Sequence, residues 1–355
     1  MKLLERARPE IVAMQPYVSA RMESVAASIM LDANESPWPA AEESATLNRY
    51  PDPQPAALRA ALADLYAVAP QNVLVGRGSD EAIDLLVRAF CVAGRDAVAV
   101  APPTFGMYAV AARIQGAAVI EAPLGPAFAL DADAMLRAIT DETKLVFACT
   151  PNNPTGNLVP LAMLAQVAET LRDRALLVVD EAYLEFAEGA LSATTLLRSH
   201  DNIAVLRTLS KAHALAGARI GALIAATPII EMLRRIQAPY PLPQSSVDAA
   251  LVALSAAALA KTDVRTATLC GERERLARAL ADAPDVLEVF ASAANFLCVR
   301  FRDSRAVYRR LLTLGIVVRD VSRYRALENC LRISIGSAQQ NAALLDALTQ
   351  REIAA

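Results

Sequence analysis

Residues 203–225 read IAVLRTLSKAHALAGARIGALIA, and this segment indicates the architecture of the chain most clearly. It contains two short apolar runs, at 203–208 and 221–225, which have the length and composition of buried strands. The loop between them begins with Ser210 and Lys211. Ligands of open parallel sheets bind outside strand ends, so Lys211 is a candidate functional residue. A surface lysine after a strand is the alternative for a Ser-Lys pair taken alone.

The same alternation of apolar runs and amphipathic stretches continues towards the N-terminus. Runs such as AVAV, LVFA and LLVV are apolar at every position, as expected of strands covered by helices on both faces. Strands that alternate with helices predict an α/β fold with a mostly parallel sheet between helices. We expect seven strands, at residues 72–75, 97–100, 117–121, 145–150, 176–180, 203–208 and 221–225, with helices that include 54–66, 80–92 and 104–115.

Composition divides the chain into three parts. Residues 1–50 are irregular and rich in Pro, Asn and Ser, and are predicted to form an N-terminal arm and part of a small domain. Residues 51–246 hold the alternating pattern and are predicted to form the large domain, which ends at the proline-rich segment APYPLPQSS. Residues 247–355 begin with a long helical stretch, and strand candidates follow at 295–300, 316–319 and 330–335. This part predicts a smaller α+β domain.

Charge and composition exclude several classes of protein. The 355 residues carry 35 basic and 38 acidic side chains without a clustered basic face, so no nucleic-acid partner is expected. The longest uncharged run, residues 145–168, is broken by three prolines and cannot be a membrane helix. Five cysteines without CxxC spacing fit reduced thiols in a cytoplasmic protein. His200 and His213 lack neighbouring ligands at metal spacing, so no metal is expected.

Polar groups after several strand candidates match the needs of a cofactor with an aldehyde, a pyridine nitrogen, a phenolic oxygen and a phosphate. Lys211 could bind the aldehyde. Asp180 ends the apolar run ALLVVD, and a buried carboxylate needs a partner because an unpaired buried charge costs several kcal/mol. A protonated pyridine would be such a partner; a helix cap or an arginine pair is the alternative.

The phenolic oxygen has two candidate donors. Asn153 lies in CTPNNPTGN, where Asn-Pro and Thr-Gly favour a turn that could hold its amide rigidly. Tyr183 follows Asp180 by three residues. Tyr108, in PPTFGMY, could stack on the pyridine ring. An ordinary turn for Asn153 and a core position for Tyr108 are the alternatives.

A phosphate cup is predicted in GRGSDEAID, residues 76–84. Its glycines lead into a helix whose first turn contains Ser79 and Asp80, and free N–H groups at a helix start bind phosphate well. A tight turn without a ligand is the alternative. Ser210 and Arg219, on either side of Lys211, add a hydroxyl and a guanidinium that suit a phosphate dianion.

In this order the motifs RGSDE, PPTFGMY, PNNPTG, VVDEAYLEF and RTLSKAHALAGARIG resemble those of the fold-type I, class II aminotransferases. The resemblance spans nearly the whole chain, because MQPYVSAR, LDANESP, RYPDPQP and NCLRISIGS belong to the same pattern. DEAYLEF and QAPYPLP favour the histidinol-phosphate branch. The resemblance implies the PLP-dependent transferase fold of type I, with pyridoxal 5'-phosphate (PLP) as the cofactor.

The resemblance also implies a role for each matching residue. Lys211 would hold PLP as a Schiff base and move a proton between substrate and cofactor, and Asp180 would pair with the pyridinium nitrogen. Asn153 and Tyr183 would bind the phenolic oxygen. The remaining implied contacts are Gly78, Ser79, Asp80, Ser210 and Arg219 to the phosphate, Tyr108 to the ring, Tyr50 to the phosphate of the opposite subunit, and Tyr17, Asn34, Arg319 and Arg332 to the substrate.

The implied reaction is a ping-pong amino transfer between L-glutamate and imidazole acetol phosphate, giving L-histidinol phosphate and 2-oxoglutarate in histidine biosynthesis. A homodimer with shared sites is implied. An aromatic amino acid aminotransferase or a threonine-phosphate decarboxylase stays open, because threonine phosphate also presents a phosphate to the arginines. A non-catalytic PLP-binding regulatory protein is the third alternative. His213 stands where relatives usually have Phe or Tyr, and it is predicted to be a packed neutral side chain, with charge tuning of the cofactor as the alternative.

Overall fold

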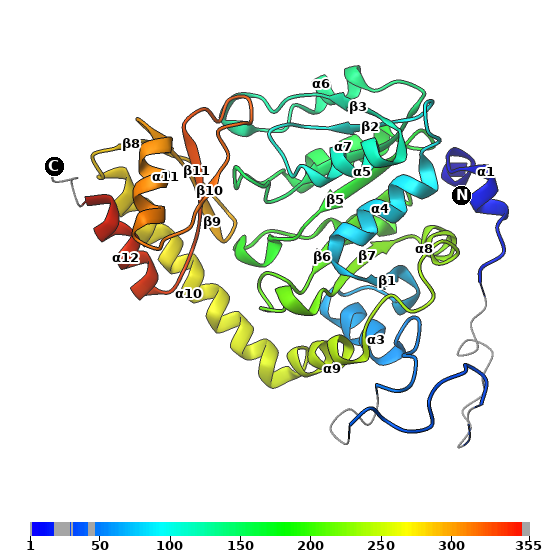
Figure 1. The fold of residues 1–355 in the computed structure, drawn as a ribbon. Helices are drawn as coiled ribbons and strands as arrows, with labels where there is room; N and C mark the ends of the chain where they lie inside the picture. The colour runs from blue at the N-terminus through cyan, green and yellow to red at the C-terminus, as the bar shows by residue number, and fades with distance from the viewer. Residues whose placement is uncertain (1, 18–28, 30, 42–46, 350–355) are drawn as a thin grey trace.

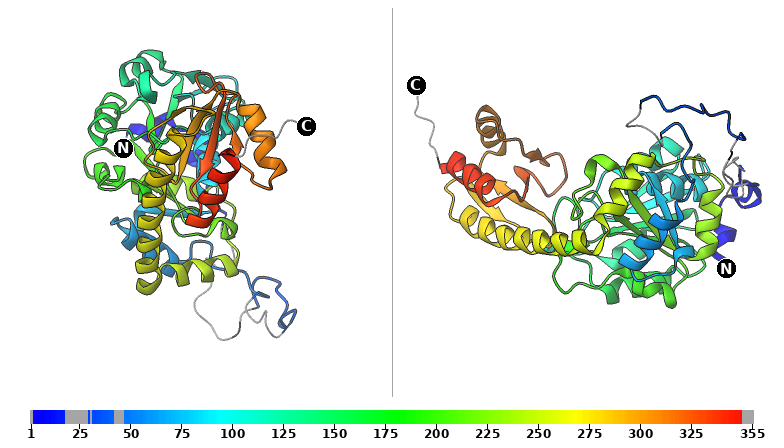
Figure 2. Two further views of the ribbon diagram at one scale, coloured as in Figure 1. Left: turned by 90° about the vertical axis from the view of Figure 1, so that its left-hand side faces the viewer. Right: turned by 90° about the horizontal axis from the view of Figure 1, so that it is seen from below.

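The computed structural model describes residues 2–17, 29, 31–41 and 47–349. Two sheets, one of seven and one of four strands, form the centres of a large and a small domain (Figure 1). Helix α10 (Ala256–Ala281) runs from the large domain to the small one (Figure 2). In the described part of the chain, no helix combines the length and the apolar character needed to cross a membrane.

All seven predicted strands of the large sheet are present. They are β1 (Val73–Gly76), β2 (Ala97–Val100), β3 (Ala118–Glu121), β4 (Thr143–Cys149), β5 (Leu176–Asp180), β6 (Ile203–Thr208) and β7 (Gly221–Ala225). Their order is β1-β7-β6-β5-β4-β2-β3. Strand β7 pairs antiparallel with β1 and β6, and the other pairs are parallel, so the sheet is mostly parallel as predicted.

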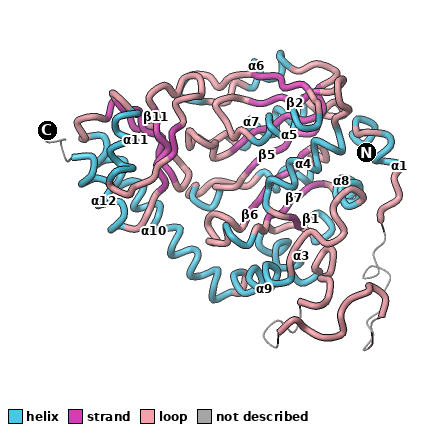
Figure 3. Tube along the Cα trace, in the orientation of Figure 1, coloured by secondary structure: helices cyan, strands magenta, loops and turns pink. Residues whose placement is uncertain are grey.

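Helices cover both faces of this sheet, which explains the apolar runs in its central strands (Figure 3). In β5, Leu177 and Val179 belong to one core and Leu176 and Val178 to the other, because side chains alternate across a strand. One face packs against α3 (Ala56–Leu65), α6 (Ala132–Ala138), α7 (Leu161–Thr170) and α9 (Gln244–Ala253), and the other against α1 (Pro9–Ala13), α4 (Gly78–Phe90), α5 (Met107–Gln115) and α8 (Thr227–Arg234).

The small sheet is antiparallel, in the order β10-β11-β9-β8. One of its strands, β8, had no counterpart among the predicted strands, because the segment VLEV is only partly buried. The candidate at 316–319 shrinks to two residues, since the Ile316 N–H bonds back to the end of the preceding helix at Leu311. The elements are β8 (Val286–Val289), β9 (Phe296–Phe301), β10 (Arg319–Asp320), β11 (Cys330–Ser334), α11 (Ser304–Thr313) and α12 (Ala338–Thr349).

Two ends of the large domain differ from the predicted boundaries. Leu3 and Ile11 share a core with α4 and α8, so residues 2–13 pack on the large domain and not on the small one. The predicted boundary at residue 246 falls inside α9, whose Val247 is buried in the large-domain core.

The described residues also form short 3-10 segments: η1 (Lys2–Arg6), η3 (Pro70–Asn72), η4 (Pro126–Phe128), η5 (Leu184–Phe186), η6 (Ala193–Arg198) and η7 (Ala216–Ala218).

Candidate active site

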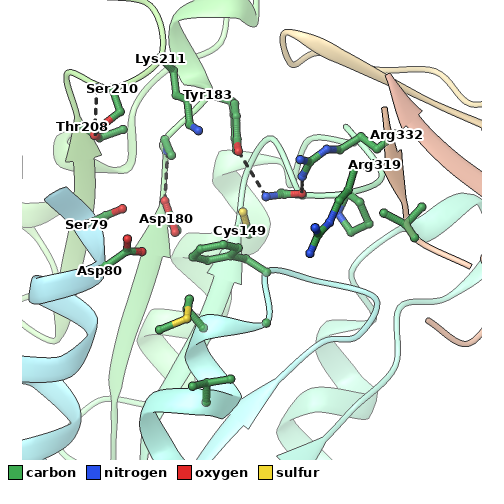
Figure 4. Close-up of a pocket in the computed structure, with 18 of the residues that line it drawn as sticks. Ser79, Asp80, Cys149, Asp180, Tyr183, Thr208, Ser210, Lys211, Arg319 and Arg332 are labelled. Atoms are coloured by element: carbon green, nitrogen blue, oxygen red, sulfur yellow. Dashed lines mark hydrogen bonds between the residues drawn. The ribbon is translucent and has the colours of Figure 1, made fainter. Parts of the chain in front are cut away.

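A cavity of about 520 Å³ lies at the carboxyl-terminal edge of the large sheet and is closed on one side by residues of the small domain. Cys149, Asp180 and Thr208, the last residues of β4, β5 and β6, all line it. Parallel strands end at one edge, which is why segments far apart in sequence meet here. Figure 4 shows Ser79 and Asp80 on one side of this cavity and Arg319 and Arg332 on the other.

Asp180 is the buried acid of the site, with only 2% of its surface exposed. Its Oδ2 accepts a hydrogen bond from the Tyr108 hydroxyl at 2.7 Å, and its Oδ1 accepts one from the Ala182 N–H at 3.1 Å. Both of these partners are neutral. Burial therefore raises the pKa of Asp180 to about 6. A cation in the cavity would stabilise the ionised carboxylate.

Lys211 enters the cavity from the loop after β6. Its Nζ lies 5.5 Å from the centre of the Tyr183 ring. Partial desolvation, and then the guanidinium of Arg332, lower the pKa of Lys211. A lowered pKa increases the fraction of neutral amine, which is the form that attacks a carbonyl.

A chain of hydrogen bonds connects the two domains across the cavity. The Asn153 Nδ2 donates to the Tyr183 hydroxyl at 3.2 Å, and the Asn153 Oδ1 accepts from the Arg332 Nη1 at 2.5 Å. The Tyr183 ring packs edge-on against Phe296 of β9. The amide of Asn153 is thereby oriented, and Arg332 is held beside it.

The turn that is predicted to hold a phosphate lies at the start of α4. Gly78 has φ +79°, a conformation that glycine adopts readily. A Cβ on Gly221 of β7 would lie 2.5 Å from the Gly78 carbonyl carbon, so the turn rests directly on that glycine. Arg219 approaches Asp80 Oδ2 and Ser210 Oγ, each at 3.4 Å. The N–H groups at a helix start and a nearby guanidinium are groups that suit an anion.

The stacking role expected for Tyr108 is wrong. Helix α5 begins at Met107 and not at residue 104, so Tyr108 lies in its first turn and points into the core. There it is 1% exposed and stacks on Phe147 with ring centres 4.6 Å apart. Phe105, in the loop before the helix, lines the cavity instead. Tyr108 contacts the site through its hydrogen bond to Asp180.

Three predicted residues near the N-terminus do not line the cavity of their own chain. Tyr17 is 68% exposed, and Asn34 is also exposed, with φ 56°. Tyr50 is half exposed and stacks on Tyr240 at 4.4 Å between ring centres. Arg319, by contrast, lines the cavity, directly opposite Arg332 in the β10–β11 pair.

Comparison with known proteins identifies the family of this chain. The family model described as aminotransferase class I and II matches residues 19–348. The chain belongs to this aminotransferase family. It is 52% identical over 358 residues to a histidinol-phosphate aminotransferase of Stenotrophomonas maltophilia, covering 99% of this chain and 98% of that protein. It is 50% identical over 359 residues to one of Xanthomonas euvesicatoria, with 99% of each covered.

Solved structures show the same fold for this aminotransferase. The crystal structure of histidinol-phosphate aminotransferase from Sinorhizobium meliloti in complex with pyridoxal 5'-phosphate has a TM-score of 0.79 and 29% identity, with 89% of each chain covered. An L-threonine-O-3-phosphate decarboxylase from Porphyromonas gingivalis has a TM-score of 0.73 at 22% identity, with 85% of this chain and 90% of that chain covered. The second likeness shows the fold alone.

PLP is the cofactor of this aminotransferase, and the residues of the cavity fit it. Asp180 is a buried carboxylate with two neutral partners, which suits a protonated pyridine nitrogen. The Gly78 turn and Arg219 suit a phosphate, and Lys211 suits an aldehyde. Tyr183 and Asn153 have polar atoms within 3.2 Å of each other, which suits a shared phenolic oxygen.

His213 lies behind the loop of Lys211, in a second cavity beside Glu185 and Arg207. It is 8% exposed, and burial is the main cause that lowers its pKa. Its Nε2 is 4.0 Å from Glu185 Oε1, and neither ring nitrogen has a hydrogen-bond partner among the described residues. These surroundings favour the packed neutral side chain over charge tuning.

Sequence reasoning missed several residues of the cavity wall, among them Phe105, Cys149, Arg323 and Tyr324. Cys149 could have been found, because it ends β4 in register with Asp180. Phe105 was overlooked because Tyr108, the second aromatic residue of PPTFGMY, was given the stacking role. Arg323 and Tyr324 lie between β10 and β11 in a loop without a motif, so only the fold brings them to the cavity.

Proposed function

We propose that this aminotransferase transfers the amino group between L-glutamate and imidazole acetol phosphate, giving L-histidinol phosphate and 2-oxoglutarate. The observation behind the proposal is the pair Arg319 and Arg332, which face the cavity from opposite positions on β10 and β11. They provide an anion site far from the phosphate cup (Figure 4). The curated relatives that are 50–52% identical bear the name of the same reaction.

When bound, PLP supplies an aldehyde that condenses with amines and a ring that accepts electrons from the substrate. Lys211 provides the amine that holds this aldehyde between turnovers, and then moves a proton to and from the substrate Cα. Asp180 holds a positive charge on the ring nitrogen, since its buried carboxylate is stabilised by that charge. Phe105, which lines the cavity from the large domain, would lie against the ring.

Arg319 and Arg332 orient the substrate. A guanidinium forms paired hydrogen bonds with a carboxylate or a phosphate, so the two arginines can bind either amino donor in turn. Arg332 is already oriented by the Asn153 amide at 2.5 Å. Sequential use of one anion site by two donors is the behaviour that a ping-pong mechanism requires.

We further propose a cytoplasmic homodimer with shared sites. Tyr17, Asn34 and Tyr50 lie outside the cavity of their own chain, as expected of residues that complete the site of a partner. All five cysteines are free, as in a reducing compartment. Sedimentation equilibrium with and without Tyr50→Phe tests the assembly: we expect dimers that retain PLP less well in the variant. A fully active monomer would contradict the shared site.

The reaction is tested by measuring glutamate formation from L-histidinol phosphate and 2-oxoglutarate. L-phenylalanine serves as the control donor, and O-phospho-L-threonine is tested for release of carbon dioxide. We expect the highest kcat/KM with histidinol phosphate and parallel lines in double-reciprocal plots. Preference for phenylalanine, or decarboxylation of phosphothreonine without glutamate formation, would overturn the proposal in favour of a sibling activity.

A further inference from the structure

The cavity has an uneven charge distribution. Arg219 approaches Asp80 at the phosphate cup, whereas Arg319, Arg323 and Arg332 gather at the small-domain end. Within the described residues, none of these three arginines has a carboxylate oxygen within 4 Å. Three cations without counter-charges indicate a ligand group with more negative charge than a single carboxylate.

The loop that holds Arg323 is fixed at several points. Val321 and Leu327, on either side of Arg323, are buried with Phe128 and Cys298. The Val321 N–H donates to the Cys330 carbonyl, and the Leu327 N–H donates to the Tyr324 carbonyl. From β9, Arg300 donates to the carbonyls at positions 326 and 328. Arg323 is therefore presented by an anchored loop, although its own side chain is exposed.

Tyr324 places Arg323 at the cavity wall. The Arg323 guanidinium carbon lies 5.2 Å from the centre of the Tyr324 ring, which is within the range of a cation–π contact. The hydroxyl of Tyr324 reaches the large domain, where a Cβ on Gly106 would lie 3.5 Å from it. Gly106 follows Phe105, so the Tyr324 hydroxyl lies beside the aromatic wall of the cavity, and the ring of Tyr324 supports the Arg323 guanidinium there.

We propose that Arg323, positioned by Tyr324, is a third anion-binding arginine that favours a phosphate-bearing donor over a dicarboxylate. The inference rests on the proposed function. Glutamate offers two carboxylates, each with two oxygens, which Arg319 and Arg332 can satisfy. A phosphate monoester has three free oxygens and a charge near −2 at neutral pH, so it has room for another guanidinium.

The test is Arg323→Gln, with each donor measured separately in single-turnover half-reactions. For histidinol phosphate we expect a loss in kcat/KM of about tenfold, the size of one charge-assisted hydrogen bond. L-histidinol, which lacks the phosphate, and L-glutamate should each lose less than about threefold. Arg325→Gln is the matched control, because Arg325 is exposed in the same loop but does not line the cavity.

Tyr324 is tested as a positioning residue by the ratio of kcat/KM for histidinol phosphate to that for histidinol. Tyr324→Leu should lower this ratio towards that of Arg323→Gln, and Tyr324→Phe, which keeps the ring, should preserve it. Equal losses with all three donors, or no loss with histidinol phosphate, would overturn the role of Arg323. An inactive wild-type enzyme with histidinol phosphate would instead overturn the proposed function itself.

Discussion

The phosphate-cup end of the cavity and its arginine end are held by different kinds of structure. At the cup end, Gly78 follows the edge strand β1 and Asp180 ends the central strand β5, and both residues are buried in the large domain. At the arginine end, Arg319 is exposed on a two-residue strand of the small domain. The difference separates two tasks. The large sheet fixes the groups that are proposed to bind the cofactor, whereas the groups proposed to bind the substrate belong to the small domain, where they can vary without disturbing the cofactor site.

The difference between the two ends of the cavity is tested most strongly by removing the Lys211 amine at the cup end. Lys211→Ala should lower turnover by at least about 10³-fold, because both the attachment point and the proton carrier are lost. Circular dichroism should be unchanged, since Lys211 is a loop residue, and some PLP should still bind. Lys261→Ala, an exposed lysine on α10, is the control and should keep full activity. Substantial transamination by Lys211→Ala would refute the assignment.

Replacing the buried acid should separate catalysis from stability. Asp180→Asn keeps the shape but removes the charge, so we expect kcat to fall by about 10²-fold, measured in the same assay. The folded protein without PLP should become more stable, because a buried charge with neutral partners has been removed. A variant with wild-type kcat would show that no charge on the cofactor nitrogen is needed.

The difference in the free energy of unfolding between the wild type and Asp180→Asn should depend on pH in a defined direction. The pKa of Asp180 is raised from 3.8 to about 6, so folding favours its protonated form. Wild-type stability without PLP should therefore decline relative to Asp180→Asn as pH rises from about 4 to above 6. The expected change is about 3 kcal/mol, at 1.4 kcal/mol for each tenfold change in proton affinity. Urea unfolding at pH 4 and pH 7 measures it, and a constant difference would contradict the raised pKa.

A smaller effect is expected from the contact that supports the cup. Gly221→Ala places a Cβ 2.5 Å from the Gly78 carbonyl carbon, so the α4 turn must shift. We expect a loss of about 2 kcal/mol in the free energy of unfolding and about tenfold weaker PLP binding. Gly271→Ala is the matched control, since nothing lies within 4 Å of its added methyl. Equal stability of both variants would show that the cup does not rest on Gly221.

The smallest catalytic effect is expected from a change at His213, which lines the second cavity. His213→Phe should leave the pH midpoint of the cofactor absorbance unchanged, because the packed histidine is neutral. The variant should gain about 1 kcal/mol of stability, since two buried ring nitrogens without described partners are removed. Burial lowers the pKa of His213, so the gain should grow as pH falls below 6.5. A shifted absorbance midpoint would favour charge tuning.

Strand periodicity predicted the large sheet well, because its central strands contain runs that are apolar on both faces. Asp180 could be placed because it ends β5, and Lys211 and Arg219 because they lie in the loop between β6 and β7. The start of α5 could not, since two aromatics three residues apart fit a helix that begins at either 104 or 107. Because of that shift of three residues, Phe105 and not Tyr108 lines the cavity.

The arginine end was less accessible to prediction. Arg319 and Arg332 could be named only from a family motif, and Arg323 has no local pattern that distinguishes it from Arg325. Their positions follow from long-range pairing of β10 with β11 and from burial of Val321 and Leu327. Contacts between distant segments leave no periodic signal in the sequence. For the same reason, the packing of residues 2–13 on the large domain was not foreseen.

Lys211 is expected to hold PLP at the cup end. Borohydride reduction of the PLP-loaded protein would fix that bond as a stable secondary amine, and trypsin digestion would locate it by mass spectrometry. We predict a modified peptide TLSKAHALAGAR, residues 208–219, uncleaved at Lys211 because its amine is blocked. A pyridoxyl group on Lys2, Lys144 or Lys261, with residues 208–219 cleaved at an unmodified Lys211, would contradict the account.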